Sequence, residues 1–175
     1  MYPEPLQDQK GRIKLRHSEE SDAAAVRAIY AQPSCFASTL QAPFPSLARW
    51  QQRLGSLPDN CYSLVAEIDG EVVGQIGMEV CAAPRRKHVA TLGMAVSEDF
   101  QGIGVGSALL AAMMDLAHNW LAVRRIELEV YTDNHAAIRL YKRHGFVIEG
   151  EAIGYGFRNG EYVDAFLMAS LREFS

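Results

Sequence analysis

The sequence has no excess of positive charge and no long apolar run, and each absence excludes a class of protein. Its 175 residues include 17 lysines and arginines against 21 acidic residues, a formal net charge of -4. A nucleic-acid-binding protein needs a basic surface to neutralise phosphates, so a dedicated nucleic-acid partner is not expected. No apolar run approaches the ~20 residues of a membrane span, and the first residues lack a signal-peptide layout. We therefore expect no membrane partner.

Cysteine is also scarce. Cys35, Cys61 and Cys81 are scattered and odd in number. They form no CxxC pair and no Cys/His spacing typical of zinc sites, so the sequence predicts neither a metal centre nor a disulfide framework. We expect three free thiols and, with no targeting segment, a reducing cytoplasmic setting.

The hydrophobic content of 49% is that of an ordinary globular protein, and the length suits one domain. We expect a single domain over residues 1–175, in which the polar residues 1–10 form a loose arm. Hydrophobic periodicity predicts where strands and helices lie. The expected strands are 13–17, 62–68, 71–80, 89–96 and 125–131 with two more in the tail, and the expected helices run from 18 or 21 to 31, from 46 towards 58, over 109–120 and over 134–144.

Strands outnumber helices in this order, and hairpins precede a strand–helix–strand unit. Asp69-Gly70 and Asn159-Gly160 are favoured tight-turn pairs between strand-like runs. The sequence therefore predicts an α/β (α+β) fold with a mixed, mostly antiparallel central sheet of about seven strands and flanking helices. Pro33 is expected to stop the first helix and to leave residues 34–45 irregular.

The loop Gln101-Gly102-Ile103-Gly104-Val105-Gly106 lies between a predicted strand and a strongly apolar helix. The first amides of a helix have no internal partners and carry partial positive charge, so this order of elements forms an anion site. The glycines let the backbone approach a phosphate closely. A P-loop is excluded because no lysine follows Gly106, and a GxGxxG dinucleotide loop would require glycine where Ser107 stands.

The loop does satisfy another pattern, Gln/Arg-x-x-Gly-x-Gly/Ala. A second segment follows, Asn134-x-x-Ala137-x-x-Leu140-Tyr141-x-x-x-Gly145-Phe146. With both motifs the chain resembles the GNAT superfamily of acetyl-CoA-dependent N-acetyltransferases over roughly residues 61–168. The resemblance implies acetyl-CoA as co-substrate, no metal, and a V-shaped gap where the central parallel strands 89–96 and 125–131 splay apart.

The resemblance also implies which residues contact acetyl-CoA. Backbone groups of strand 89–96 would pair with the pantetheine arm, amides of the glycine-rich loop would hold the pyrophosphate, and the second motif would contact the arm from a helix. The implied cofactor-binding residues are Met94, Ala95, Val96, Gln101, Gly102, Ile103, Gly104, Val105, Gly106, Ser107, Asn134, Ala137 and Tyr141.

Amine acetylation must remove a proton from a bound ammonium group, and it gains from a proton donor at the departing thiolate. Tyr141 is the candidate donor, because the resemblance places it near the sulfur. Glu129 is a candidate base, and Glu127, two residues earlier on the same strand face, could raise its pKa. Glu79 on the neighbouring hairpin strand and a water chain to the solvent are the alternatives.

The acceptor is expected to contact the segments in which GNAT proteins differ most. Here these are residues 34–45, called the acceptor segment below, and the hairpin 155–162. Residues 40–50 and 158–164 resemble the branch that acetylates free amino acids, so we expect a small-molecule amine, the α-amino group of a small amino acid or analogue. The candidate acceptor-binding residues are Phe36, Thr39, Leu40 and Tyr155, with Gln41, Phe44 and Arg158 as further members of the pocket.

Other interpretations stay open. A protein N-terminus, as for a ribosomal-protein acetyltransferase, is the nearest alternative acceptor. The same fold could sense acyl-CoA without turnover. A nucleotide-dependent oxidoreductase is a third alternative, since Glu127 supplies an acidic residue after the loop, but Ser107 and the hairpin-rich first half argue against it. Dimers are common among GNAT proteins, so a homodimer is a candidate assembly.

Overall fold

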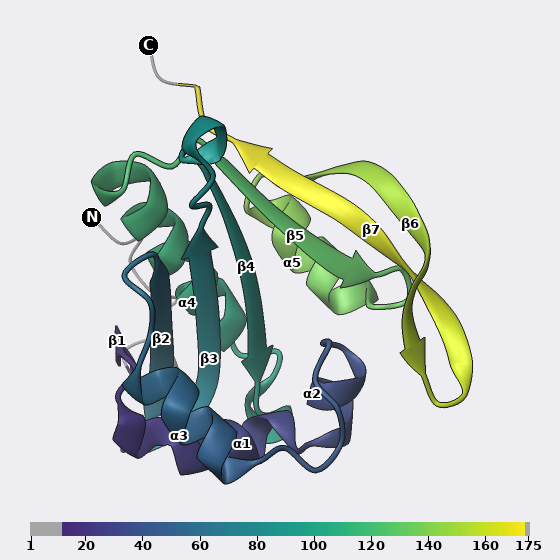
Figure 1. Cartoon of the computed structure of the whole chain (residues 1–175). Coiled ribbons are helices and arrows are strands. Elements are labelled where there is room, and N and C mark those ends of the chain that lie inside the picture. Colours follow the sequence, from purple (N-terminus) through teal and green to yellow (C-terminus); the bar gives the residue numbers. More distant parts are fainter. Residues whose placement is uncertain (1–11, 174–175) are drawn as a thin grey trace.

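The computed structural model describes residues 12–173, so the expected arm at 1–10 lies outside the described residues. The described part contains a seven-stranded sheet in the order β1-β2-β3-β4-β5-β7-β6 (Figure 1). The predicted order of strands and helices is confirmed except for one additional short helix, α2, between the first two predicted helices. The strands are β1 (Ile13–His17), β2 (Cys61–Ile68), β3 (Glu71–Val80), β4 (Val89–Val96), β5 (Arg125–Tyr131), β6 (Val147–Arg158) and β7 (Glu161–Leu171), and the α-helices are α1 (Ala23–Tyr30), α2 (Pro33–Ala37), α3 (Leu47–Gly55), α4 (Val105–Asp115) and α5 (His135–Arg143).

Neighbouring strands pair antiparallel except β4 and β5, which are parallel. The prediction of a mixed, mostly antiparallel sheet is therefore confirmed. At the two predicted hairpin turns, Asp69 and Gly70 have φ of 51° and 81°, and Asn159 and Gly160 have φ of 51° and 80°. Two consecutive positive φ angles fit a type I′ turn, whose twist matches that of the flanking strands.

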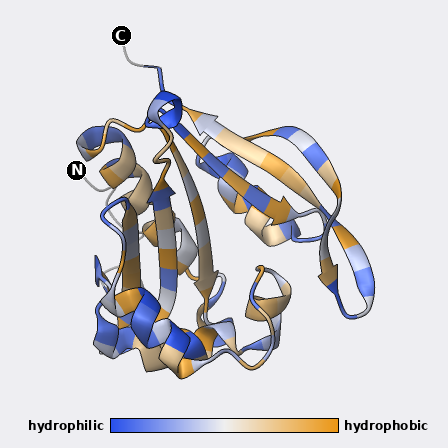
Figure 2. Ribbon diagram, in the orientation of Figure 1, coloured by the Kyte–Doolittle hydropathy of each residue, from blue (hydrophilic) through white to orange (hydrophobic). Residues whose placement is uncertain are grey.

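Helices cover both faces of the sheet (Figure 1). A Cβ on Gly74 of β3 would lie 3.0 Å from side chains of α4, at Val105 and Leu109. The next residue, Gln75, bonds Tyr30 of α1 instead. Because successive strand residues point to opposite faces, α4 and α1 lie on opposite sides of the sheet. Hydrophobic residues concentrate in the strands between these layers, whereas α3 presents hydrophilic residues outward (Figure 2).

The expectation that Pro33 stops the first helix needs correction. α1 already ends at Tyr30, and Pro33 is the first residue of the short helix α2, inside a region expected to be irregular. Its fixed φ and missing amide proton suit proline to the first helical position. The helix matters for the site, because it brings Cys35 against the end of β4.

The apolar face of the helix after the glycine-rich loop is also shorter than expected. α4 ends at Asp115, and a π-helical turn follows at Leu116–Trp120. Trp120 is 76% exposed. The change of helical period carries this side chain out of the core, so the regular helix expected over 109–120 is wrong in its last turn.

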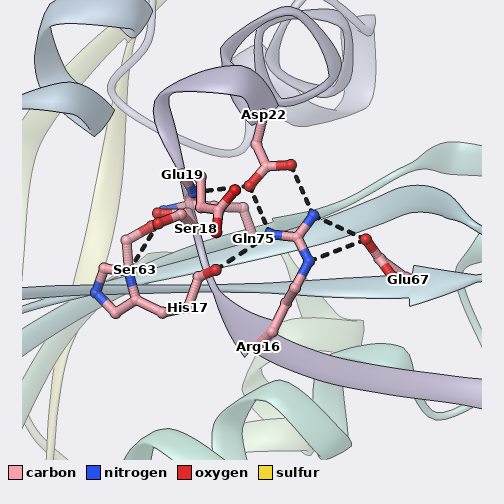
Figure 3. Close-up of polar contacts among 8 residues, drawn as sticks. All are labelled: Arg16, His17, Ser18, Glu19, Asp22, Ser63, Glu67 and Gln75. Carbon is pink, nitrogen blue, oxygen red and sulfur yellow. Dashed lines mark hydrogen bonds and ion pairs between the residues drawn. The ribbon is translucent and has the colours of Figure 1, made fainter.

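An ion-pair cluster fixes α1 relative to the sheet (Figure 3). Arg16 of β1 donates to both carboxylate oxygens of Asp22, at 2.7 and 2.8 Å, and to Oε1 of Glu67 on β2 at 2.7 Å. The amide of Glu19 donates to Asp22 at 2.7 Å. The guanidinium of Arg16 holds the pKa of the Asp22 carboxyl below its ordinary value, although burial acts in the opposite direction. Asp22 immediately precedes α1, so the cluster sets where Tyr30 meets the sheet.

Candidate active site

A cavity of 860 Å³ lies where β4 and β5 separate. Its lining comes from α1, α2 and α3, from β2 to β6, and from the glycine-rich loop and α5. The structure therefore brings both sequence motifs and the acceptor segment to one cavity. The candidate residues that line it are Thr39, Leu40, Gln41, Glu79, Met94, Ala95, Val96, Gln101, Gly102, Gly104, Gly106, Ser107, Glu129, Asn134, Ala137, Tyr141 and Tyr155.

β4 and β5 pair only at their beginnings, where Val89–Thr91 meets Arg125–Glu127. Both strands continue beyond these residues without a ladder between them, as Figure 1 shows. One edge of β4 is therefore free to pair with an extended chain. At the end of this edge the Val96 carbonyl already accepts bonds from Gln101 Nε2 at 3.0 Å and from Cys35 Sγ at 3.3 Å.

The N-terminus of α4 borders the same cavity and has no side-chain cap. Gly104 is its N-cap residue, with φ of 97°, and Gly102 has φ of 77°. Glycine adopts such angles without strain. The amides in the first turn of α4 have no partner within the helix. Those amides and the helix dipole suit an anion. The loop therefore fits the pyrophosphate of acetyl-CoA.

Three loop residues behave differently from a simple phosphate cradle. The side chains of Ile103 and Val105 pack in the hydrophobic core, so only their main-chain groups can reach the cavity. Gly106 is needed for packing: a Cβ there would lie 3.0 Å from Cε of Met94 and 3.3 Å from Cδ2 of Leu140. The missing side chain lets α4 approach β4 and α5 closely.

His144 connects the two motifs. Its Nδ1 lies 3.0 Å from the carbonyl oxygen of Leu140, which can only accept, so Nδ1 carries the proton. Nε2 then accepts from the hydroxyl of Ser107 at 3.2 Å. The imidazole thereby ties the end of α5 to the first turn of α4. The four-residue spacing from Leu140 could have indicated the first bond, and nothing local indicates the second.

Tyr141 reaches the cavity from α5. It is 7% exposed, and its ring packs against Phe146 with centroids 5.7 Å apart. Burial raises the pKa of Tyr141 to about 12. Its hydroxyl makes no hydrogen bond with the residues that the structure describes. The phenol is therefore protonated at neutral pH, and its proton is available to a group in the cavity.

Two of the carboxylates considered as bases line the cavity. Glu129 on β5 and Glu79 on β3 are exposed there, and neither has an ion-pair partner among residues 12–173. Glu127 is instead paired with Arg86 and Arg125. Glu127 is therefore held by two guanidinium groups, and its predicted effect on Glu129 stays a prediction.

Aromatic contacts close the acceptor end of the cavity. Tyr131 of β5 donates to the carbonyl oxygen of Thr39 at 3.1 Å, and Tyr155 of β6 packs edge-on against it, with centroids 6.4 Å apart. Arg158 lies over the Tyr131 ring, 5.2 Å from its centroid, and donates to the Ala37 carbonyl at 3.2 Å. Tyr131, which the sequence analysis did not single out, thus joins the acceptor segment to the β6–β7 hairpin.

Three predicted pocket members do not line the cavity. α2 presents Cys35 to it and not Phe36. Phe44 is 98% exposed. Arg158 is engaged in the contacts with Tyr131 and Ala37. The pocket is therefore less apolar than the sequence indicated.

The sequence analysis also missed a buried polar chain on the α1 side of the cavity. The hydroxyl of Tyr30 donates to Oε1 of Gln75 at 2.8 Å, and Nε2 of Gln75 donates to Oγ of Ser63 at 2.9 Å. All three residues are buried and line the cavity. A glutamine in the middle of a strand expected to be central was the available signal, since a buried amide requires partners.

An uncapped helix N-terminus beside two splayed parallel strands defines a fold built to bind an acyl-CoA. The chain belongs to the acetyltransferase (GNAT) family, whose profile matches residues 24–146. It is accordingly an N-acetyltransferase with acetyl-CoA as co-substrate. The resemblance inferred from the two motifs is confirmed.

Comparison with individual proteins agrees with this assignment. The chain is 48% identical over 160 residues to the L-amino acid N-acetyltransferase AaaT of Escherichia coli, covering 91% of this chain and 98% of that protein. It is 35% identical over 116 residues to an N-alpha-acetyltransferase of Sulfurisphaera tokodaii, covering 61% and 66%. A phosphinothricin acetyltransferase from Sinorhizobium meliloti, solved in complex with acetyl-CoA, has a TM-score of 0.82 at 21% identity, covering 91% and 88%.

Other expectations concern ligands and surroundings. Within the described residues, no helix is long and apolar enough to cross a membrane, and no three His, Cys, Asp or Glu side chains are grouped to hold a metal ion. Cys35, Cys61 and Cys81 are free, as predicted.

Proposed function

We propose that the chain acetylates the α-amino group of small amino acids or close analogues. The observation that carries the proposal is the 48% identity to the Escherichia coli amino-acid N-acetyltransferase. The match spans 98% of that relative, so it extends well beyond the two acetyl-CoA motifs.

A panel of free amino acids, polyamines, aminoglycosides and peptides, assayed by CoA release with DTNB, tests the proposal. We expect small amino acids to give the highest kcat/KM. Preference for peptide N-termini would instead make the chain a protein N-acetyltransferase, the alternative that the Sulfurisphaera relative favours. CoA binding without turnover of any amine would favour an acyl-CoA sensor.

For acetyl-CoA, the proposed contacts are the free edge of β4 at Met94, Ala95 and Val96 and the main chain of residues 101–107. Asn134 and Ala137 would contact the arm from α5. Asn134 Oδ1 accepts from the Ala137 amide at 3.3 Å, so the side chain is held as the N-cap of α5 while its amide hydrogens stay free. This fixed donor on the cavity wall supports the assignment.

Glu129 is proposed as the base that removes a proton from the bound ammonium group. It lies two residues beyond Glu127, the last β5 residue paired with β4, and thus at the opening of the gap. Glu79 lies in register with Thr91, the last paired residue of β4, and faces the acceptor side. Thr91 is in register with both Glu79 and Glu127, so Glu79 and Glu129 share one sheet face; Glu129 is proposed because it lies on β5 inside the gap, whereas Glu79 lies across β4 from it.

Glu129→Gln is expected to lower kcat about ten-fold at neutral pH, because a carboxamide cannot accept the proton. The rate should recover as the pH rises and more acceptor is already the free amine. Glu79→Gln is the matched comparison, since it makes the same change on the other cavity carboxylate. The measurement is the kcat–pH profile of both variants with saturating acetyl-CoA. If kcat fell at low pH only in Glu79→Gln, Glu79 and not Glu129 would be the base.

A homodimer through β6 and β7 is proposed as the assembly. Of the ten exposed large hydrophobic residues within residues 12–173, seven lie on these strands: Val147, Ile148, Ile153, Phe157, Tyr162, Leu167 and Leu171. β6 is also an edge strand, which is open to pairing. Exposed apolar patches mark interfaces, so a second copy is the proposed cover of the patch formed by Phe157 and its register partner Tyr162.

Light scattering should therefore give a mass of about twice the 19.4 kDa of the chain. Phe157→Asp, which places a charge at a 65% exposed position of the patch, should give monomers. Trp120→Asp is the control, since Trp120 is similarly exposed but lies outside β6 and β7. A monomeric wild type would refute the dimer.

A further inference from the structure

A recess floored by small residues lies beside the reaction gap. Gly77 of β3 is in register with Gly93 of β4 on one side and with Ser63 of β2 on the other. All three line the cavity. Directly paired residues of antiparallel strands point to the same face, so together they form one row across the sheet. A Cβ on Gly93 would meet no atom within 4 Å, so the floor has room above it.

Polar groups border this row on both sides. Gln75, two residues before Gly77, is held by Tyr30 and Ser63. Glu79, two residues after Gly77, is in register with Cys61. Each of these residues lines the cavity. The recess is therefore small, polar and open to the gap, as a site for a compact zwitterion should be.

Arg53 of α3 lines the same part of the cavity. Its Cζ lies 4.9 Å from the ring centroid of Trp50, and the Trp50 ring stacks on Tyr30 with centroids 4.8 Å apart and planes 20° apart. Tyr30 is in turn hydrogen-bonded to Gln75. Two stacked rings therefore connect the guanidinium of Arg53 to Gln75 in the middle of the sheet, and they hold the guanidinium in position.

Arg53 has no carboxylate partner among the described residues, unlike Arg16 or Arg125. A guanidinium with free donors at a cavity is suited to bind a carboxylate through two parallel bonds. Beyond the effect of burial, the charge of Glu79 raises the pKa of the Cys61 thiol and that of Arg53 lowers it, so both charges act at this end of the recess.

We propose that Arg53 binds the α-carboxylate of the acceptor amino acid, while the acceptor's amino group lies over Gly93 beside the gap. The amino and carboxylate groups of an α-amino acid share one carbon and lie closer together than two adjacent strands, which are about 4.8 Å apart, so the long side chain of Arg53 must reach from α3 over the sheet to meet the carboxylate. Ser63 and Gln75 supply further polar groups at the floor. The inference rests on the proposed function and adds the determinant of substrate class: a primary amine with an adjacent carboxylate.

Kinetics with matched acceptors test the subsite. Arg53→Gln should raise KM for neutral amino acids at least about ten-fold and leave kcat/KM for the corresponding amino-acid amides within about two-fold of wild type. Arg53→Lys should restore part of the loss, since it keeps the charge without the planar fork. Arg49→Gln, one turn earlier on α3 and outside the cavity lining, should behave as wild type. Equal losses with acids and amides would overturn the proposal.

Gly93→Ala examines the floor independently of Arg53. Because the added Cβ has no atom within 4 Å, the melting temperature should stay at that of the wild type. The methyl group would nevertheless occupy the recess, so KM for amino acids should rise about ten-fold. An unchanged KM would place the acceptor elsewhere in the cavity.

Binding measured without turnover separates failure of this inference from failure of the proposed function. The chain has two tryptophans, so Trp120→Phe leaves Trp50 as the remaining one. Because Arg53 lies over the Trp50 ring, the fluorescence of Trp50 reports on changes at Arg53. With CoA present, a neutral amino acid should change this signal saturably, its amide should not, and Arg53→Gln should abolish the change. Such binding without acetylation of any amino acid would support the subsite and refute the function. Acetylation that does not depend on Arg53 would refute the subsite and support the function.

Discussion

Replacing Gly106 with aspartate is expected to weaken acetyl-CoA binding by about 100-fold while the chain stays folded. The new carboxylate would stand in the uncapped first turn of α4, beside the amides that suit the pyrophosphate. Repulsion between these negative groups acts on the co-substrate only. Within the free protein, a carboxylate in the first turn of a helix is favourable, so the charge does not oppose folding. Isothermal titration with CoA measures the dissociation constant directly.

Gly106→Asn separates charge from crowding. A Cβ at this position lies 3.0 Å from Cε of Met94 and 3.3 Å from Cδ2 of Leu140, the ends of two side chains, so both variants require the same adjustment of these side chains. Asparagine should cost about ten-fold or less, and only the aspartate effect should shrink in high salt, which screens exposed charges. A dissociation constant at the wild-type value for Gly106→Asp would show that the pyrophosphate binds elsewhere.

The backbone geometry of the glycine-rich loop was predictable because it is determined locally. Residues close in sequence set the positive φ angles of Gly102 and Gly104 and the start of α4. The same holds for the hairpin turns at Asp69-Gly70 and Asn159-Gly160. In each case, the chemistry of two or three neighbouring residues determines the backbone, so the sequence pattern carries the information.

The acceptor end could not be predicted in this way, because its contacts cross the sheet. Gly93, Gly77 and Ser63 form one row only in the observed register of three strands. A shift of one residue would turn each to the other face. Arg53 joins them from a helix whose packing is fixed by Trp50 against Tyr30. Such contacts depend on tertiary structure, which no local pattern encodes.

The direction in which a side chain points also decided which candidate residues line the cavity. Phe36 and Phe44 were suggested because large apolar side chains fit a pocket, yet α2 presents Cys35, and Phe44 is exposed. Glu127 and Glu129 lie on the same strand face, but only Glu127 is within reach of Arg86 and Arg125. Residue type suggested the candidates, and packing decided which of them line the cavity.

Tyr141→Phe is expected to lower kcat by about 100-fold, because it removes one buried donor aimed at developing negative charge. The affinity for acetyl-CoA should change little, since phenylalanine keeps the ring contact with Phe146 and the sulfur is uncharged before reaction. The measurement is kcat with saturating amine together with the dissociation constant of acetyl-CoA. An unchanged kcat would remove Tyr141 from the proton path.

The raised pKa of Tyr141 determines how it can act. Moving a proton from a phenol with a pKa of about 12 to a thiolate of pKa ~8.5 is uphill by about 5 kcal/mol, so donation of a hydrogen bond is favoured over full transfer. The phenol then stays protonated throughout the range from about pH 6 to 10. The ratio of wild-type to Tyr141→Phe kcat should accordingly be constant across that range. A ratio that falls towards one between about pH 8 and 10 would mean that the phenol ionises there. Its pKa would then be close to that of the thiol, and full proton transfer from the protonated phenol to the thiolate would no longer be uphill.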